Sequence, residues 1–269
     1  LKLKDVDRIH IETLLANAED KRRTQQQILL TFSAVLKSAV SDKLLAANVA
    51  DDILRNTDKI KYKPSEKRPL TPAEKKAVFD ATYKYDSDQA YVYLIYGCGL
   101  RREECVALTI FDFSFKKREV SVSKAYEYIT NTPGVKDPKS SNGIRTIPIP
   151  SKILPVIQSY VESVKHSGRT QLFVTMRDNK PLTKSAYDKM WKRIVESMQA
   201  VCKEDIVGLT GHVFRHNYCS SLCYQIPRVS IKRIAQLLGD TEAMVMNVYS
   251  HILAEREDVE GAVNDAINF

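Results

Sequence analysis

The first 63 residues contain neither glycine nor proline, and this absence constrains the fold more than any other feature of the sequence. Without either residue to interrupt it, such a stretch favours helices. Apolar residues recur at the 3.6-residue helical period between 24 and 48, where Ile28, Phe32 and Leu36 share one face. The sequence therefore predicts a small all-helical domain over residues 1–60.

A basic segment, KIKYKPSEKRPL, follows at residues 59–70. Its two prolines and its lack of apolar periodicity indicate an exposed linker, which we place at 61–70. Residues 71–269 then form a second domain. Each part carries a net charge of +4, because 14 basic and 10 acidic residues lie in 1–70 and 27 and 23 lie in 71–269. The total of +8 favours a polyanionic partner.

The second domain has helical signals at both ends and β signals between them. Thr71, Pro72 and Glu74 predict a capped helix start, and an apolar segment at 89–99 predicts a buried helix that ends at Gly97 or Gly99. Residues 109–149 have β-like patterns around a polar loop at 130–138. Helices return after 150, with predicted N-caps at Ser151 and Thr183 and breaks at Pro227 and Gly239. The expected fold class is mainly α with a small antiparallel β-sheet.

Several classes of protein are disfavoured by composition. No run of about 18 apolar residues is present, so no membrane span is expected. The first ten residues lack the apolar stretch of a signal peptide, and they do not begin with Met, so we expect a fragment of a longer chain. The five cysteines are odd in number and lie mostly in apolar helical patterns, which favours reduced thiols in a cytoplasmic protein.

The segment LTGHVFRHNYCSSL, at 209–222, is the first candidate for chemistry. His212 and Arg215 are three residues apart and share a helical face, where a guanidinium suits a phosphate and an imidazole can move a proton. By itself the motif favours an ordinary amphipathic helix that turns both side chains to solvent. A zinc site at His212 and His216 is weaker, because no third ligand is evident and no metal is expected.

The segment YGCGLRREECVAL places Arg101 after a Gly-Leu break, with Glu104 three residues later. An i, i+3 ion pair on a helix surface accounts for this spacing. Alternatively, Arg101 binds a second phosphate oxygen, and Glu104 supports it by orienting Arg101 or a neighbouring histidine.

Two further residues are candidates only in combination with the others. Lys139 precedes a tight turn in VKDPKSSNGIRTIPIP; a lysine there is usually solvated, but one in a DNA groove can protonate a leaving alkoxide, and Lys136 is its competitor. Tyr249 lies in LLGDTEAMVMNVYSHI near the C-terminus. Because the chain has thirteen tyrosines, a structural role is the default for any one of them.

Taken in order, Gly-Leu-Arg-x-x-Glu, the hairpin lysine, His-x-x-Arg, Leu-Gly-x and the tyrosine resemble the tyrosine recombinases, or phage-type integrases. Residues 71–253 are similar to their catalytic domain, and about 1–60 to the helical core-binding domain that precedes it. HVFRHNYCSSL and LLGDTEAMVMNVYSHI are similar in style to integrases of Gram-positive conjugative transposons.

The resemblance implies a mechanism without metal or cofactor, in a site-specific recombinase that excises and integrates a mobile element. Tyr249 would attack a DNA phosphate, form a 3′-phosphotyrosyl link and release a 5′-hydroxyl. Arg101 and Arg215 would stabilise the pentacoordinate phosphorane. Lys139 would protonate the leaving oxygen, and His212 would take the tyrosine proton or hold the phosphate.

One position departs from the family pattern. Asp240 follows Leu-Gly where a histidine or tryptophan usually contacts the scissile phosphate. An aspartate repels a phosphate unless it is protonated or turned away, or it hydrogen-bonds a neighbouring site residue instead. We therefore expect a reorganised phosphate contact at Asp240 rather than an inactive enzyme.

The expected partner is a double-stranded recombination site, held between the two domains and bound mostly through phosphates. The cations expected to face DNA are Lys61, Lys63, Lys67, Arg68, Arg102, Lys136 and Arg145. The tail from 255 has helical spacing, and the resemblance implies that it docks on a neighbouring protomer to link two to four subunits on DNA in the bacterial cytoplasm. Accessory DNA-bending or excision factors and a preceding arm-binding domain belong to the same expectation.

Three other readings remain open from the residues. A non-catalytic sequence-specific DNA-binding protein fits SIKRIAQLLGD as a helix-turn-helix fragment, with Asp240 marking lost activity. A type IB topoisomerase would share the tyrosine chemistry but relax DNA. A basic scaffold for RNA or an acidic protein would account for the charge alone.

Overall fold

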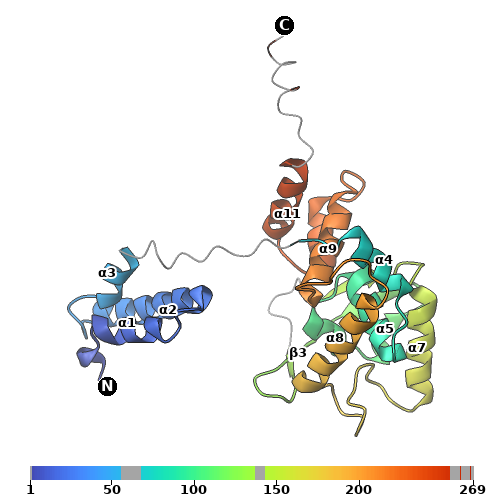
Figure 1. The fold of residues 1–269 in the computed structure, drawn as a ribbon, viewed down its shortest axis with the longest axis horizontal. Helices are drawn as coiled ribbons and strands as arrows, with labels where there is room; N and C mark the ends of the chain where they lie inside the picture. The colour runs from blue at the N-terminus through green and yellow to red at the C-terminus, as the bar shows by residue number, and fades with distance from the viewer. Residues whose placement is uncertain (1, 56–67, 137–142, 255–260, 262–266, 268–269) are drawn as a thin grey trace. The chain divides into compact units, whose positions relative to one another are not determined.

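The computed structural model describes residues 2–55, 68–136, 143–254, 261 and 267 (Figure 1). The chain forms two compact units, Leu1–Glu66 and Lys67–Phe269, and the division falls inside the segment predicted as a linker. Among the described residues, no helix is long and apolar enough to cross a lipid bilayer.

In the described part of the first unit, every secondary-structure element is a helix. Its elements are η1 (Leu3–Asp5), α1 (Arg8–Ala16), α2 (Arg22–Ser41) and α3 (Val49–Arg55). They pack around a small apolar core that includes Ile11, Leu29 and Leu36. The prediction of one helix over 24–48 is wrong at its C-terminal end, because α2 ends at Ser41 and the chain turns through Lys43, whose φ is 58°.

The second unit opens with α4 (Pro72–Asp80) and α5 (Asp86–Cys98). The predicted capping box is confirmed, since Thr71 Oγ1 accepts from the Glu74 amide at 3.1 Å and Glu74 Oε2 accepts from the Thr71 amide at 2.9 Å. Helix α5 is buried along most of its length and ends at Gly99, whose φ of 61° stops the helix. Helices α7 (Leu154–His166), α8 (Lys184–Gln199) and α9 (Gly211–Cys223) pack against it (Figure 1).

The β elements form two small antiparallel sheets. After η3 (Ile110–Asp112), the first sheet has the order β1 (Phe113–Ser114), β2 (Glu119–Val122), β5 (Arg145–Pro148), and the second pairs β3 (Ala125–Glu127) with β4 (Gly134–Lys136). The predicted loop over 130–138 is therefore wrong in part, because residues 134–136 pair with β3. The expected fold class, mainly α with a small antiparallel sheet, is confirmed.

The remaining helices are α6 (Arg102–Val106), α7 (Leu154–His166), α8 (Lys184–Gln199), α9 (Gly211–Cys223), α10 (Ile231–Leu238) and α11 (Glu242–Ala254). Thr183 caps α8 as predicted, accepting from the Ala186 amide at 3.2 Å. The predicted cap at Ser151 is wrong, because α7 begins at Leu154 and has no side-chain cap.

Two apolar clusters hold the second unit together. The larger one surrounds α5, and the smaller one lies among α9, α10 and α11 and includes Cys219, Ile234 and Val245. Figure 1 shows α11 beside α9, and the two helices are in contact. The five cysteines are free thiols, and four of them are buried. The segment between α10 and α11 therefore joins two helices of the smaller apolar cluster, and the candidate site lies at this segment.

Candidate active site

The first site arginine is positioned by the end of α5. Gly99 turns the chain at φ 61°, and a Cβ there would lie 2.3 Å from a ring carbon of Tyr218 on α9. Glycine therefore permits both the turn and the close approach of two helices. Arg101 follows as the N-cap of α6, with about a third of its side chain exposed.

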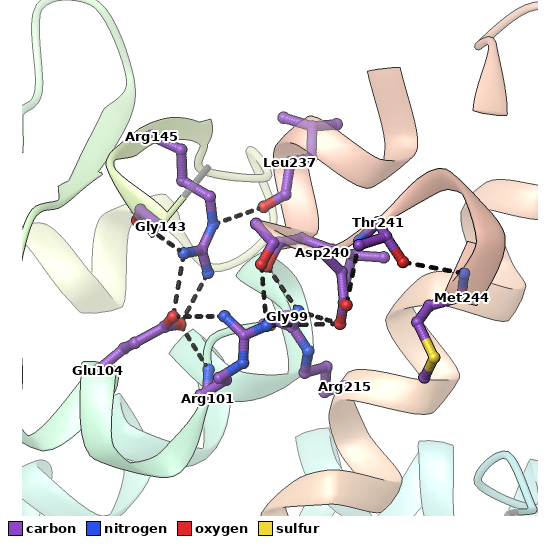
Figure 2. A network of polar contacts seen from close by, with 12 residues as sticks. Gly99, Arg101, Glu104, Gly143, Arg145, Arg215, Leu237, Asp240, Thr241 and Met244 are labelled. Atoms are coloured by element: carbon purple, nitrogen blue, oxygen red, sulfur yellow. Dashed lines mark hydrogen bonds and ion pairs between the residues drawn. The ribbon is translucent and has the colours of Figure 1, made fainter. Parts of the chain in front are cut away.

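Glu104, on the first turn of α6, is a buried acceptor for two arginines. Oε1 accepts from Arg101 Nη1 at 2.9 Å and Arg145 Nη1 at 3.0 Å, and Oε2 accepts from the Arg101 amide at 2.8 Å and Arg145 Nη2 at 2.7 Å. Burial alone would raise the pKa of Glu104, but the hydrogen bonds and charges of Arg145 and Arg101 outweigh it and lower the pKa to about 2. Glu104 therefore stays ionised and fixes both guanidiniums (Figure 2).

Arg145, at the start of β5, links the sheet to α10. Its Nε donates to the Leu237 carbonyl at 2.8 Å and its Nη1 to the Gly143 carbonyl at 3.2 Å, in addition to the two bonds to Glu104. Only 8% of the residue is exposed. Arg145 therefore joins three segments that are distant in sequence.

The second site arginine, Arg215, is buried on α9. Nη1 donates to the Gly99 carbonyl at 3.0 Å, and Nη2 donates to the Leu238 carbonyl at 2.6 Å. Burial and the nearby charge of Arg101 lower the pKa of Arg215 to about 10, so the guanidinium remains protonated at neutral pH. The end of α5 and the end of α10 are thus held by one side chain.

Arg101 and Arg215 converge on a single oxygen atom. Asp240 Oδ2 lies 3.4 Å from Arg101 Nη2 and 3.1 Å from Arg215 Nη2, and Arg101 Nη2 also donates to the Gly239 carbonyl at 2.9 Å. Figure 2 shows both guanidiniums turned toward this carboxylate. Two side chains that are more than 100 residues apart therefore form one anion-binding pair.

A cavity of about 110 Å³ lies beside this pair. It is lined by Arg101, His212, Arg215, His216, Cys219, Leu238, Asp240, Met244, Val245 and Val248. The structure thus places His212, Asp240 and both arginines at one cavity. His212 is exposed on the first turn of α9, and His216 is half-buried one turn later.

Of the predicted catalytic residues that the structure describes, Tyr249 does not line this cavity. Tyr249 is half-buried on α11 and packs against the smaller apolar cluster, whereas its neighbour Val248 lines the cavity. Lys139 lies outside the described residues.

The structure assigns structural partners to two of the cations expected to face DNA. Arg68 donates from Nη1 and Nη2 to the buried carboxylate of Glu74, both at 2.6 Å, and Nη2 donates to the Val207 carbonyl at 3.0 Å. Arg145 is buried on Glu104, as described above. In both cases a buried carboxylate already takes the guanidinium, and a DNA contact by Arg68 or Arg145 stays a prediction. Sequence reasoning missed these ion pairs because the partners, Arg68 with Glu74 and Arg145 with Glu104, share no motif.

The other expected cations differ in their surroundings. Arg102 bonds Glu103 at 2.5 and 2.8 Å and stacks 5.1 Å from the Tyr187 ring centroid, and Lys136 pairs with Glu127. A cavity of about 550 Å³ beside Arg101 gathers both with two lysines that the sequence analysis did not single out, Lys124 and Lys184. Lys61, Lys63 and Lys67 lie outside the described residues.

The arrangement suits the recognition of a singly charged anion. One Nη2 group from each arginine donates toward the same oxygen position, and His212 at the same cavity adds an imidazole, a group that can exchange a proton near neutral pH. Within the described residues, no cluster of three or more His, Cys, Asp or Glu could hold a metal ion.

Comparison with known sequences gives consistent relatives. The chain is 25% identical over 260 residues to a tyrosine recombinase of Pseudothermotoga lettingae, covering 96% of this chain and 82% of the relative. It is 23% identical to the ICEBs1 integrase of Bacillus subtilis over 265 residues, which are 92% of this chain and 65% of that integrase.

Solved structures share the fold. The Tn1549 transposon integrase in complex with circular intermediate DNA superposes with a TM-score of 0.74 at 21% identity, covering 96% of this chain and 87% of the integrase chain. A lambda integrase dimer bound to a COC′ core site gives a TM-score of 0.60 at 16% identity, covering 93% and 81%. The sequence model of the phage integrase family matches residues 68–256, which include the whole arginine cluster and α11. The chain therefore belongs to the phage integrase family of tyrosine recombinases.

Proposed function

We propose that this protein is a site-specific DNA recombinase that cuts and rejoins the ends of a mobile element through a phosphotyrosyl intermediate at Tyr249. The observation that carries the proposal is the convergence of Arg101 and Arg215 on one anionic oxygen, 3.4 and 3.1 Å away. A non-bridging oxygen of a scissile phosphate bound there would contact both guanidiniums. The charge that develops on the phosphorane would then be stabilised by groups already held in place.

The proposed reaction conserves the phosphodiester bond energy. The Tyr249 phenolic oxygen attacks phosphorus, the bond to the 5′-oxygen breaks, and the phenolic proton passes to a base while the leaving oxygen takes a proton. His212 at the cavity is the candidate for the base, and Lys139 is the candidate acid by family likeness. The reverse reaction with a 5′-hydroxyl of a second strand rejoins the DNA.

This chemistry requires a change in the position of Tyr249. Its side chain packs with the smaller apolar cluster rather than lining the cavity, although Val248 and Val245 of the same helix do line it. Helix α11 follows Asp240 after a single residue, Thr241. We propose that phosphate binding and the entry of Tyr249 occur together, through a shift or rotation of α11.

DNA and a second copy of the chain are the proposed partners. The Tn1549 and lambda integrases were solved with DNA, and the lambda structure contains a dimer. By likeness we propose two to four protomers on a bacterial recombination site, linked through the segment after α11, with accessory factors that set the direction of exchange. The first unit would bind DNA as a core-binding domain, and the second would perform the chemistry.

A nicked suicide duplex tests the proposal. The target site is first selected from a pool of random duplexes by binding to the full chain. The wild type is expected to form a covalent adduct on that site, Tyr249→Phe is expected to form none, and Tyr224→Phe, on an exposed tyrosine, serves as the matched control.

The outcomes separate the competing functions. Strand exchange between two duplexes supports recombination, whereas relaxation of supercoiled DNA without exchange supports a topoisomerase of type IB. Specific binding with no adduct on any selected site would contradict catalysis and support a DNA-binding protein.

A further inference from the structure

Asp240 occupies the place that the proposed function assigns to a phosphate oxygen. Its Oδ2 accepts hydrogen bonds from Nη2 of both Arg101 and Arg215, and its Oδ1 accepts from the Thr241 amide at 3.1 Å. Figure 2 shows the carboxylate facing the two guanidiniums. The side chain is 29% exposed, whereas that of Arg215 is 9% exposed, so Asp240 lies on the solvent side of the buried arginine.

The arginine pair needs an anion. Arg101 lies close enough to lower the pKa of Arg215, which is also disfavoured as a cation by burial. Apart from Asp240, the recorded partners of Arg215 are the Gly99 and Leu238 carbonyls. Glu104 neutralises part of the positive charge of Arg101, but its carboxylate is shared with Arg145. Among the described residues, Asp240 is therefore the carboxylate that hydrogen-bonds both Arg101 and Arg215, while Glu104 adds a second negative charge nearby.

The same hydrogen atoms cannot serve two anions at once. A phosphate oxygen that bridges Arg101 and Arg215 needs the Nη2 groups that Asp240 Oδ2 now holds, and two anions a few ångströms apart repel each other. Either the phosphate takes a poorer position, or the carboxylate leaves.

Resting on the proposed function, we propose that Asp240 is an internal competitor for the phosphate site: its carboxylate holds the place of one phosphate oxygen until a DNA phosphate displaces it. Displacement breaks no backbone contact of Arg101 or Arg215, because the carbonyls of Gly99, Leu238 and Gly239 continue to hold them. Only Thr241 separates the released side chain from α11, so occupancy of the site is communicated directly to the helix that carries Tyr249.

A purely structural role for Asp240 makes the opposite prediction. If the carboxylate is needed to orient the guanidiniums, removing its charge weakens the binding of every anion at the site. If it competes with the ligand, removing its charge strengthens binding. Asp240→Asn keeps the shape of the side chain and an oxygen acceptor, and Asp240→Ser removes the carboxylate altogether.

Binding of inorganic phosphate separates the two roles without any DNA. The full chain is titrated with phosphate, and binding is followed by the NMR shifts of the arginine Nε–H groups, with melting monitored by the fluorescence of Trp191 to verify the fold. A unit charge at this distance changes a binding constant about tenfold at a partly exposed site. We expect about tenfold tighter binding in both Asp240→Asn and Asp240→Ser.

The matched control is Glu242→Gln, which removes a negative charge two residues away on an exposed side chain. We expect it to change phosphate binding less than about twofold, because screening weakens exposed charges. Weaker or unchanged phosphate binding in the folded Asp240 variants would overturn the proposal.

A second arm uses the suicide duplex. Asp240→Asn is expected to reach half-maximal adduct formation at a lower DNA concentration than the wild type. If the wild type forms an adduct and the variant needs more DNA, the competitor role fails and the recombinase function stands. If the wild type forms no adduct, the proposed function fails, and the phosphate titration still decides the role of Asp240.

Discussion

Replacing Glu104 by glutamine tests whether one buried carboxylate organises the site. Each of its oxygens accepts two hydrogen bonds, one from Arg101 and one from Arg145. Glutamine has only one oxygen, so in either orientation its amide NH₂ faces two donors. The substitution removes the charge, leaves Arg145 without its carboxylate partner and preserves the volume of the side chain.

Two estimates of the cost agree. Lowering the pKa of Glu104 from 4.5 to about 2 corresponds to about 3 kcal/mol of stability at neutral pH. Removing one partner of a buried ion pair costs about 3–5 kcal/mol. Because the pKa in the folded protein is below that in the unfolded chain, this contribution is present above pH 4.5 and is lost as the pH falls from 4.5 toward 2.

Urea unfolding followed by Trp191 fluorescence measures this cost, since the only tryptophan lies in the unit that contains the site. We expect Glu104→Gln to lose about 3 kcal/mol at pH 7, and its difference from the wild type to be about 1 kcal/mol smaller at pH 4. Glu103→Gln is the control, because Glu103 pairs with Arg102 at a partly exposed position and should cost less than about 1 kcal/mol. Equal losses in both variants, or a difference that does not change with pH, would refute the reasoning.

Gly99→Ala should lower the free energy of unfolding by more than about 2 kcal/mol, because the added Cβ meets the Tyr218 ring. Gly168→Ala has a similar positive φ but open space around the Cβ, so it should lose only about 1 kcal/mol. Equal losses in thermal melts of the two variants would contradict this. Arg68→Met should cost about 2 kcal/mol in urea unfolding yet leave the salt dependence of DNA affinity unchanged; a smaller salt slope would restore it as a phosphate contact. Arg215→Lys should reduce adduct formation about 100-fold while binding of the selected duplex changes less than about threefold; comparable losses in both would argue against a transition-state role.

Local signals in the sequence predicted several elements correctly. Thr71 and Thr183 cap their helices, and Gly99 and Gly239 end theirs in the left-handed conformation. These features depend on residues within one helical turn, so a short window of sequence contains the information.

Long-range pairing explains what could not be predicted. Residues 134–136 have no strand pattern of their own, so the sequence predicts a loop there, but they form β4 by pairing with β3. Ser151 is a good capping residue, but α7 begins three residues later. The sequence does not predict the ion pair of Arg145 with Glu104, because the two residues are 41 positions apart.

The sequence predicts which residues form the candidate site, but not how they are arranged in space. The order of motifs pointed to Arg101, His212 and Arg215, and the structure places all three at one cavity. The sequence shows that Asp240 departs from the family pattern, but only the folded structure places its carboxylate between the two arginines. The position of Tyr249 on the smaller apolar cluster depends on how α11 packs, which no motif encodes.

Mapping the covalent link by mass spectrometry tests the central claim most directly. The adduct trapped on a nicked duplex is digested with nuclease and protease, and the residue that retains a 3′-nucleotide is identified among the thirteen tyrosines and the serines of the chain. The account predicts a single modified residue, Tyr249, and no adduct in Arg101→Ala or Arg215→Ala. A nucleotide on any other residue, or an adduct that forms equally well without either arginine, would contradict it.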